Sequence, residues 1–207
     1  MNINSAILKG GIAINVNKEY NVLYPKSIWP GLKLKTKQSI IGNLAYAKSA
    51  SYSVFLKDEF IFNSALPHLK SFFDKCAVKD FPRFAHEDNL SVKEMIENFK
   101  NAKFRFASNE ASMPEEDACT EDGAVLGMSF GKDSLLSYAV AKEIKLPVKL
   151  VFVKDCGKAE LKHKLSIMRE FKKKFNEEIF MLKDDTDNIA FDKAINTINS
   201  EGIYGSN

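Results

Sequence analysis

The feature that most constrains the fold is a regular alternation of apolar runs and helix-like segments that begins at Ala124. Apolar runs at 124–130, 148–153 and 178–182 are typical of strands. The segments between them, 133–144 and 158–176, place apolar residues at helical spacing. Strands that alternate with helices of this length predict βαβ units, in which right-handed crossovers join parallel strands. We therefore expect an α/β layer with a parallel sheet.

Two details of this alternation carry further expectations. The run 124–130 is almost continuously apolar, so it fits a strand buried on both faces. The helix that follows carries Leu136, Val140 and Ile144 at helical spacing. A third helix is predicted over 187–198.

The first half of the chain is less regular. Short apolar and aromatic runs at 5–24 and 51–62 are broken by polar residues and glycine, which favours strands in an antiparallel or mixed arrangement. The segments 66–76 and 92–99 are more helical in pattern. The topology of this half stays open.

An acidic, polar segment separates the two halves and predicts the domain organisation. It covers 109–123 and is typical of a linker or an exposed loop. We therefore expect a smaller α+β domain over 1–108, with a possible role in substrate recognition, and an α/β domain over 124–207. Few residues follow the first strand and helix, whereas an open parallel sheet of this class usually has about five strands. The α/β domain is expected to be incomplete at its carboxyl end.

Composition and charge exclude several classes of protein. The chain of 207 residues is 45% hydrophobic and 28% charged, as in globular proteins, and its net charge of +3 is too small to favour a nucleic-acid partner. The amino terminus lacks the apolar core of a signal peptide, and no apolar run is long enough to span a bilayer. Three cysteines without a CxxC pair suit a reducing compartment, so we expect a cytoplasmic location.

The turn between the first strand and the first helix of the α/β layer carries the residues most suited to chemistry. Ligands of such sheets bind beyond the carboxyl ends of the strands. Gly131 leaves the backbone open to a phosphate, and the first amides of the helix point outward. The hydroxyls of Ser129 and Ser134 can donate to phosphate oxygens, Lys132 can neutralise charge, and Asp133 can bind Mg²⁺. These residues predict a site for a pyrophosphate group with magnesium.

Two simpler interpretations compete for this turn. A Walker A loop needs four residues between its glycines and Ser or Thr after the lysine, but Gly127 and Gly131 enclose three residues and Asp133 follows Lys132. That motif is therefore absent. Alternatively, the serines of the turn cap the helix and Asp133 stabilises its positive end. This interpretation stays open, although capping does not require Gly131 and Lys132.

A third interpretation is a serine hydrolase. Residues 127–131 match the G-x-S-x-G nucleophile elbow, with Ser129 as the nucleophile, and the strand-turn-helix context is the one that this motif needs. The motif also needs an acid and a histidine later in the chain. Only His163 follows, in a lysine-rich helix one strand further on. A serine hydrolase is therefore the alternative from a different class of enzyme.

The loop resembles the signature of a known superfamily. Residues 129–134, S-F-G-K-D-S, are similar to the S-G-G-x-D-S signature of the PP-loop ATP pyrophosphatases, with Phe130 at the position of the second glycine. Together with Leu135 and Leu136, they resemble the S-F-G-K-[DE]-S-L-L form of the ATP-dependent UDP-N-acetylmuramoyl-L-alanyl-L-glutamate epimerases and their uncharacterised relatives. The specific resemblance covers 124–155. It implies a HUP-type, Rossmann-like domain.

The resemblance also implies a reaction and a set of site residues. In this superfamily a substrate oxygen, often a carboxylate, attacks the α-phosphate of ATP to give an adenylate and pyrophosphate. ATP and Mg²⁺ would be bound by 129–134, with Lys132 and Asp133 as catalytic residues and Asp133 as metal ligand. By position, Val153 and Asp155 would approach the nucleoside. The partner would be a small carboxylate, and the reaction an epimerisation of a glutamyl residue.

Other members of the superfamily leave further alternatives. Some modify transfer RNA, amidate their substrates or transfer sulfur, and the sulfur-transfer enzymes commonly use reactive cysteines, so the lack of CxxC favours adenylation. A non-catalytic ATP-binding module is also open. The sequence predicts neither the general base nor the oligomeric state.

Overall fold

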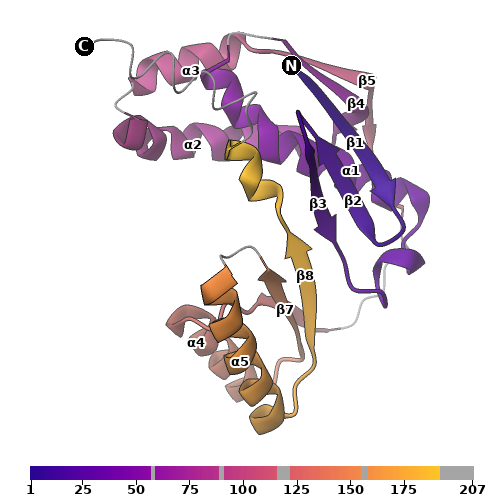
Figure 1. Cartoon of the computed structure of the whole chain (residues 1–207), viewed down its shortest axis with the longest axis vertical. Coiled ribbons are helices and arrows are strands. Elements are labelled where there is room, and N and C mark those ends of the chain that lie inside the picture. The colour runs from indigo at the N-terminus through magenta and orange to yellow at the C-terminus, as the bar shows by residue number, and fades with distance from the viewer. Residues whose placement is uncertain (57–58, 89–90, 116–121, 155–157, 192–207) are drawn as a thin grey trace. The chain divides into compact units, whose positions relative to one another are not determined.

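A computed structural model shows an α/β protein that divides into two compact units (Figure 1). The structure describes residues 1–56, 59–88, 91–115, 122–154 and 158–191. Unit 1 comprises the described parts of Met1–Asn21, Leu32–Glu116 and Thr186–Asn207. Unit 2 comprises those of Val22–Gly31 and Asp117–Asp185.

Unit 1 is built on a mixed sheet with the strand order β5-β4-β1-β2-β3. β1 and β2 form an antiparallel pair, whereas β4 pairs in parallel with both β1 and β5. The mixed arrangement expected for this half is confirmed. The strands of the unit are β1 (Asn2–Leu8), β2 (Gly11–Asn15), β3 (Glu19–Leu23), β4 (Glu59–Pro67) and β5 (Lys103–Ser112).

Three α-helices accompany this sheet, and α1 packs on β1 and β4. Aromatic side chains dominate the core, in which the Tyr46 ring of α1 meets Phe62 of β4 and Phe104 of β5 at centroid distances of 5.8 and 5.3 Å. Buried polar residues of α1 bond within the helix and to neighbouring segments: the Ser49 hydroxyl donates to the Ala45 carbonyl at 2.6 Å, and Asn43 Oδ1 accepts from the Leu69 amide at 3.0 Å. The helices are α1 (Leu34–Ser49), α2 (Lys70–Asp88) and α3 (Val92–Asn101), and a 3₁₀ helix covers Ala50–Val54.

Unit 2 contains the predicted βαβ units, which are confirmed. Its strands follow the order β8-β7-β6, and both pairs are parallel. The end of β3 adds an antiparallel pair, with Val22 opposite Asp184. The elements are β6 (Ala124–Gly127), α4 (Lys132–Glu143), β7 (Val148–Lys154), α5 (Lys158–Phe175) and β8 (Ile179–Asp184). A separate core fills this unit, formed by Met128, Phe130, Tyr138, Leu150, Phe152, Met168, Phe171 and Ile179.

The surroundings of β6 and α4 differ from the sequence expectation. β6 pairs only with β7 among the described strands, and Val125 is 75% exposed, so the expectation of a strand buried on both faces was wrong. Leu136, Val140 and Ile144 are likewise exposed, while α4 turns Tyr138 toward the core. The apolar stripe lies at the surface because no described element packs against it.

Two boundaries also differ from the expected ones. β5 continues through Ser112, which pairs with Pro67, so the first part of the segment 109–123 is strand rather than linker. Backbone pairing to β4 holds these polar residues in place. The described part of the helix expected over 187–198 is a 3₁₀ helix, Thr186–Phe191, and Ile189 is fully buried in the core of unit 1. Unit 1 also contains the larger share of the chain.

Candidate functional site

The PP-loop-like residues form the turn between β6 and α4, at the carboxyl end of β6. The Met128 amide donates to the Val151 carbonyl at 2.7 Å, which continues the alignment with β7 beyond Gly127. Gly131 then occupies the cap position in an extended conformation, and α4 begins at Lys132. The first helical hydrogen bond runs from the Leu135 amide to the Gly131 carbonyl, at 3.1 Å. The six residues therefore lie where ligands bind in parallel α/β sheets.

Phe130 adopts a left-handed backbone conformation, with φ of 61°. This conformation costs a residue with a Cβ about 1–2 kcal/mol, which is why a glycine suits the position. The Phe130 side chain is 9% exposed and its ring lies 5.8 Å from each of Phe152 and Phe171. Burial of an aromatic ring contributes about 2–3 kcal/mol, enough to offset the strain. Phe130 therefore holds a backbone conformation that glycine would adopt without strain.

The two serine hydroxyls of the loop bond to one another and to the turn. Ser129 Oγ donates to Ser134 Oγ at 3.3 Å, and Ser134 Oγ donates to the Gly131 carbonyl at 3.0 Å. The Gly131 amide donates to Ser129 Oγ at 3.4 Å. Neither hydroxyl accepts a hydrogen bond from the first turn of α4, which has no side-chain cap. The capping interpretation of these serines is therefore wrong.

The first turn of α4 consequently offers unused donors. The amides of Lys132, Asp133 and Ser134 donate to no group in the described parts of the chain. The side chains of Lys132 and Asp133 are exposed and form no ion pair with any described residue. A helix start with free amides is a positive site that favours phosphate groups. Lys132 adds a mobile positive charge beside it, and Asp133 adds an oxygen ligand for a cation.

A cavity of about 280 Å³ opens at the carboxyl ends of β6 and β7. Ser129 and Val153 line it, as do Gly127, Met128, Val151 and Phe152. The structure therefore brings Val153 to the same cavity as the loop, whereas Asp155 lies outside the described residues. Lys164 of α5 also lines the cavity and was missed by the sequence analysis. The sequence could have indicated this lysine, because Leu161 and Leu165 pack on the core of unit 2 and Lys164 lies beside them on the same helix.

A polar network fixes the direction of α4 and was also absent from the sequence analysis. The Tyr138 hydroxyl donates to Glu177 Oε1 at 2.8 Å, and Lys142 forms an ion pair with the same oxygen at 2.6 Å. Burial, together with the Glu177 hydrogen bond, raises the pKa of Tyr138 to about 12. The hydrogen bond from Lys142 holds the pKa of Glu177 below its usual range. The network ties α4 to the segment before β8 and thereby supports the loop.

The geometry does not assemble the serine hydrolase expected as an alternative. The strained residue of the turn is Phe130 rather than Ser129, although the elbow motif strains its nucleophile. The Ser129 hydroxyl forms hydrogen bonds with Ser134 and Gly131, and His163 is exposed on α5. Within the described residues, no histidine reaches Ser129.

Comparison with known proteins identifies no relative. No protein-family model matches the chain, and neither a curated protein nor a solved structure matches it. In the described parts, none of the helices combines the length and apolar character needed to cross a membrane. Nor do three or more His, Cys, Asp or Glu side chains gather there into a metal site.

Proposed function

We propose that unit 2 binds ATP and Mg²⁺ through 129–134 and that the protein is an adenylating enzyme of the PP-loop type. The observation that carries the proposal is the start of α4, where three free amides stand beside the unpaired side chains of Lys132 and Asp133. Such a set suits a pyrophosphate group, because donors and positive charge converge where negative charge accumulates. The cavity beside Ser129 and Val153 would accept the rest of the nucleotide.

The proposed reaction, which the resemblance of the loop implies, would use this arrangement as follows. A carboxylate oxygen of the substrate attacks the α-phosphorus, and the bond from that phosphorus to the bridging oxygen breaks. The electron pair leaves with pyrophosphate, whose charge the α4 amides and Lys132 stabilise. Asp133 would hold Mg²⁺, which supplies further neutralisation of the phosphate oxygens. The finer proposal is that the adenylate activates a glutamyl residue of a cell-wall precursor for epimerisation, as the likeness of the loop suggests.

Release of pyrophosphate tests the proposal. The full chain is incubated with ATP, Mg²⁺ and a panel of carboxylates that includes muramoyl-dipeptide nucleotides. We expect release that depends on one class of acceptor and falls about 100-fold or more in Lys132→Ala, because loss of one charge-stabilising group has this effect in enzymes. Lys173→Ala, an exposed lysine at the far end of α5, is the matched control and should retain activity.

Asp133 is tested separately, by its dependence on Mg²⁺. Asp133→Asn should raise the Mg²⁺ concentration needed for release, whereas Glu143→Gln on the same helix should not. ATP binding without pyrophosphate release with any acceptor would reduce the site to a binding module. No binding of ATP at all would refute the proposal.

A further inference from the structure

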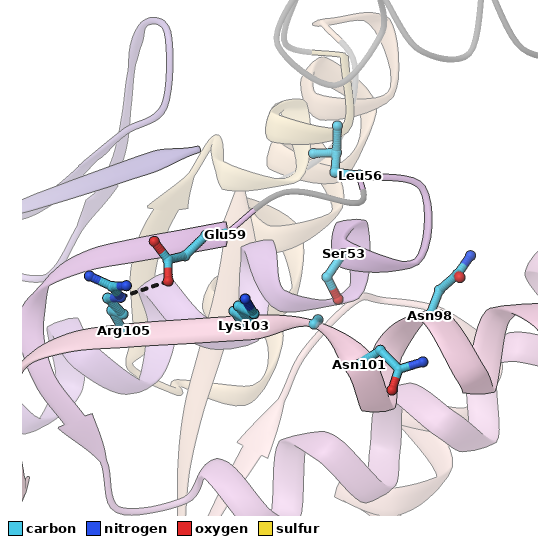
Figure 2. A pocket seen from close by; sticks show the side chains of 8 residues that line it. Ser53, Leu56, Glu59, Asn98, Asn101, Lys103 and Arg105 are labelled. Carbon is cyan, nitrogen blue, oxygen red and sulfur yellow. Dashed lines mark ion pairs between the residues drawn. The ribbon is translucent and has the colours of Figure 1, made fainter.

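A second cavity lies in unit 1, and none of its lining residues belongs to the loop. Its volume of about 560 Å³ falls in the range of small-molecule sites. Figure 2 shows its lining, which comes from β4, β5, the end of α3 and the 3₁₀ helix before β4. The lining residues are Ser53, Leu56, Glu59, Asn98, Asn101, Ala102, Lys103 and Arg105.

One side of the cavity carries excess positive charge. β5 alternates, so Phe104 packs on the core while Lys103 and Arg105 share the opposite face. Glu59 lies directly across from Lys103 in the neighbouring strand and pairs with Arg105 through Nε, at 2.6 Å. The Lys103 side chain forms no ion pair or hydrogen bond with any described residue. The ammonium of Lys103 and the outer edge of the Arg105 guanidinium remain available to an anion.

The other side of the cavity offers hydrogen-bond acceptors. It is formed by the carboxyl end of α3, where the last carbonyls of the helix carry partial negative charge. Asn98 Nδ2 already donates to the Val54 carbonyl at 2.9 Å, which leaves its oxygen free to accept. The Ser53 hydroxyl donates to the Ala50 carbonyl at 2.7 Å and likewise keeps its lone pairs. In Figure 2 the asparagines and the Glu59–Arg105 pair stand on opposite sides, with Lys103 between them.

We propose that this cavity binds a small zwitterion of the amino-acid or short-peptide class. The carboxylate of the ligand lies at Lys103 and Arg105, and its ammonium or amide N–H groups face Ser53 and the end of α3. A ligand with a phosphate group fits less well, because the lining carries two cations against Glu59 and the helix end repels added negative charge. The proposal does not depend on the function of the loop.

Capped dipeptides test both halves of the recognition. The full chain is titrated with L-alanyl-L-alanine, its N-acetyl form, its carboxamide form and inorganic phosphate, while backbone amide resonances are followed by NMR. We expect the dipeptide to shift resonances around Asn98–Arg105, and each capped form to bind about 10-fold more weakly, as for the loss of one charged hydrogen bond. Absence of shifts at about 10 mM dipeptide, a concentration that reveals even millimolar affinity, would refute the proposal.

A variant pair separates specific binding from surface attraction. Lys103→Ala removes the free ammonium from an exposed strand position, so the fold should be retained, and we expect about a 10-fold loss of dipeptide affinity. Lys100→Ala removes an exposed charge of α3 outside the lining and should bind as the wild type does. Equal affinity of wild type and Lys103→Ala, or phosphate binding as tight as that of the dipeptide, would overturn the assignment.

Discussion

Substitution of Phe130 separates the strain of the turn from the packing of its side chain. Phe130→Ala removes the buried ring but keeps the left-handed strain, since alanine has a Cβ. Loss of a buried phenylalanine costs about 3–5 kcal/mol, and we expect the lower end because Phe130 is the most exposed of the buried residues in its cluster. Phe130→Gly loses the same ring but relieves the strain, so it should be about 1 kcal/mol more stable than Phe130→Ala.

At most positions a glycine variant is less stable than the alanine variant, so the expected order at Phe130 is reversed. A position with regular strand backbone provides the control. Phe152 lies in β7, is 1% exposed and contacts the Phe130 ring. Its backbone is regular strand, where glycine destabilises by about 0.5–1 kcal/mol relative to alanine. Phe152→Gly should therefore be less stable than Phe152→Ala.

The single tryptophan provides a fluorescence probe within unit 2. Trp29 belongs to unit 2, is 1% exposed and stacks on Tyr24 at a centroid distance of 4.7 Å. Urea titration followed by its fluorescence gives the midpoint for each variant, and equal slopes license comparison of the free energies. If Phe130→Gly proves less stable than Phe130→Ala, the turn does not impose left-handed strain in solution. The claim that burial of the Phe130 ring offsets such strain would then be wrong.

Three further predictions concern stability. Lys145 closes α4 in a left-handed Schellman turn, with the Leu146 amide bonded to the Ala141 carbonyl at 2.8 Å, so Lys145→Gly should stabilise unit 2 by up to about 1 kcal/mol in the same titration. The buried Ser64 hydroxyl finds no partner among the described residues, so Ser64→Ala should raise the free energy of unfolding of unit 1 by about 1 kcal/mol. Ser49→Ala should lower it by about as much, because that variant removes the bond to the Ala45 carbonyl. Calorimetry measures both, and an equal loss in Ser64→Ala would show that water satisfies the Ser64 hydroxyl. Because the fold lowers the pKa of Glu177, its ionised carboxylate stabilises the folded state at pH values above the pKa of the unfolded state. This stability is lost as the pH falls below about 4. Glu177→Gln should therefore weaken the dependence of the free energy of unfolding on pH in the acid range, measured by Trp29 fluorescence.

The sequence predicts unit 2 well because its elements follow local periodicity. Five predicted elements correspond to β6, α4, β7, α5 and β8, with ends within a few residues; the exception is the helix expected over 187–198, whose described part is a 3₁₀ helix. Turn chemistry also places the loop correctly between β6 and α4. What periodicity cannot predict is the face that becomes buried: Leu136, Val140 and Ile144 have the right spacing for a core and lie at the surface, while the hydroxyl-bearing Tyr138 points inward and bonds to Glu177.

Unit 1 is predicted poorly because its helices and strands violate simple patterns. In α1, Ser39, Asn43 and Ser49 are buried, so the helix shows no apolar stripe and was not predicted. Their polar groups are satisfied both within the helix and by residues distant in the sequence: Asn43 Nδ2 donates to the Ser39 carbonyl at 2.7 Å, and Asn43 Oδ1 accepts from the Leu69 amide at 3.0 Å. The polar end of β5 was likewise assigned to a linker, because a strand held by backbone pairing needs no apolar side chains. Such satisfaction depends on partners that a single sequence does not reveal.

The relation between Phe130 and the loop shows how a motif can tolerate a departure at its most constrained position. A glycine permits the turn by itself, whereas Phe130 permits it only because Phe152 and Phe171 bury the ring. The backbone conformation at the start of α4 therefore depends on the packing of β7 and α5. If the proposed function holds, substitutions in that cluster should alter anion binding at the start of α4 without contacting the anion. In this protein the core supports a backbone conformation that suits glycine, so a resemblance at this turn must be judged by backbone geometry as well as by residue identity.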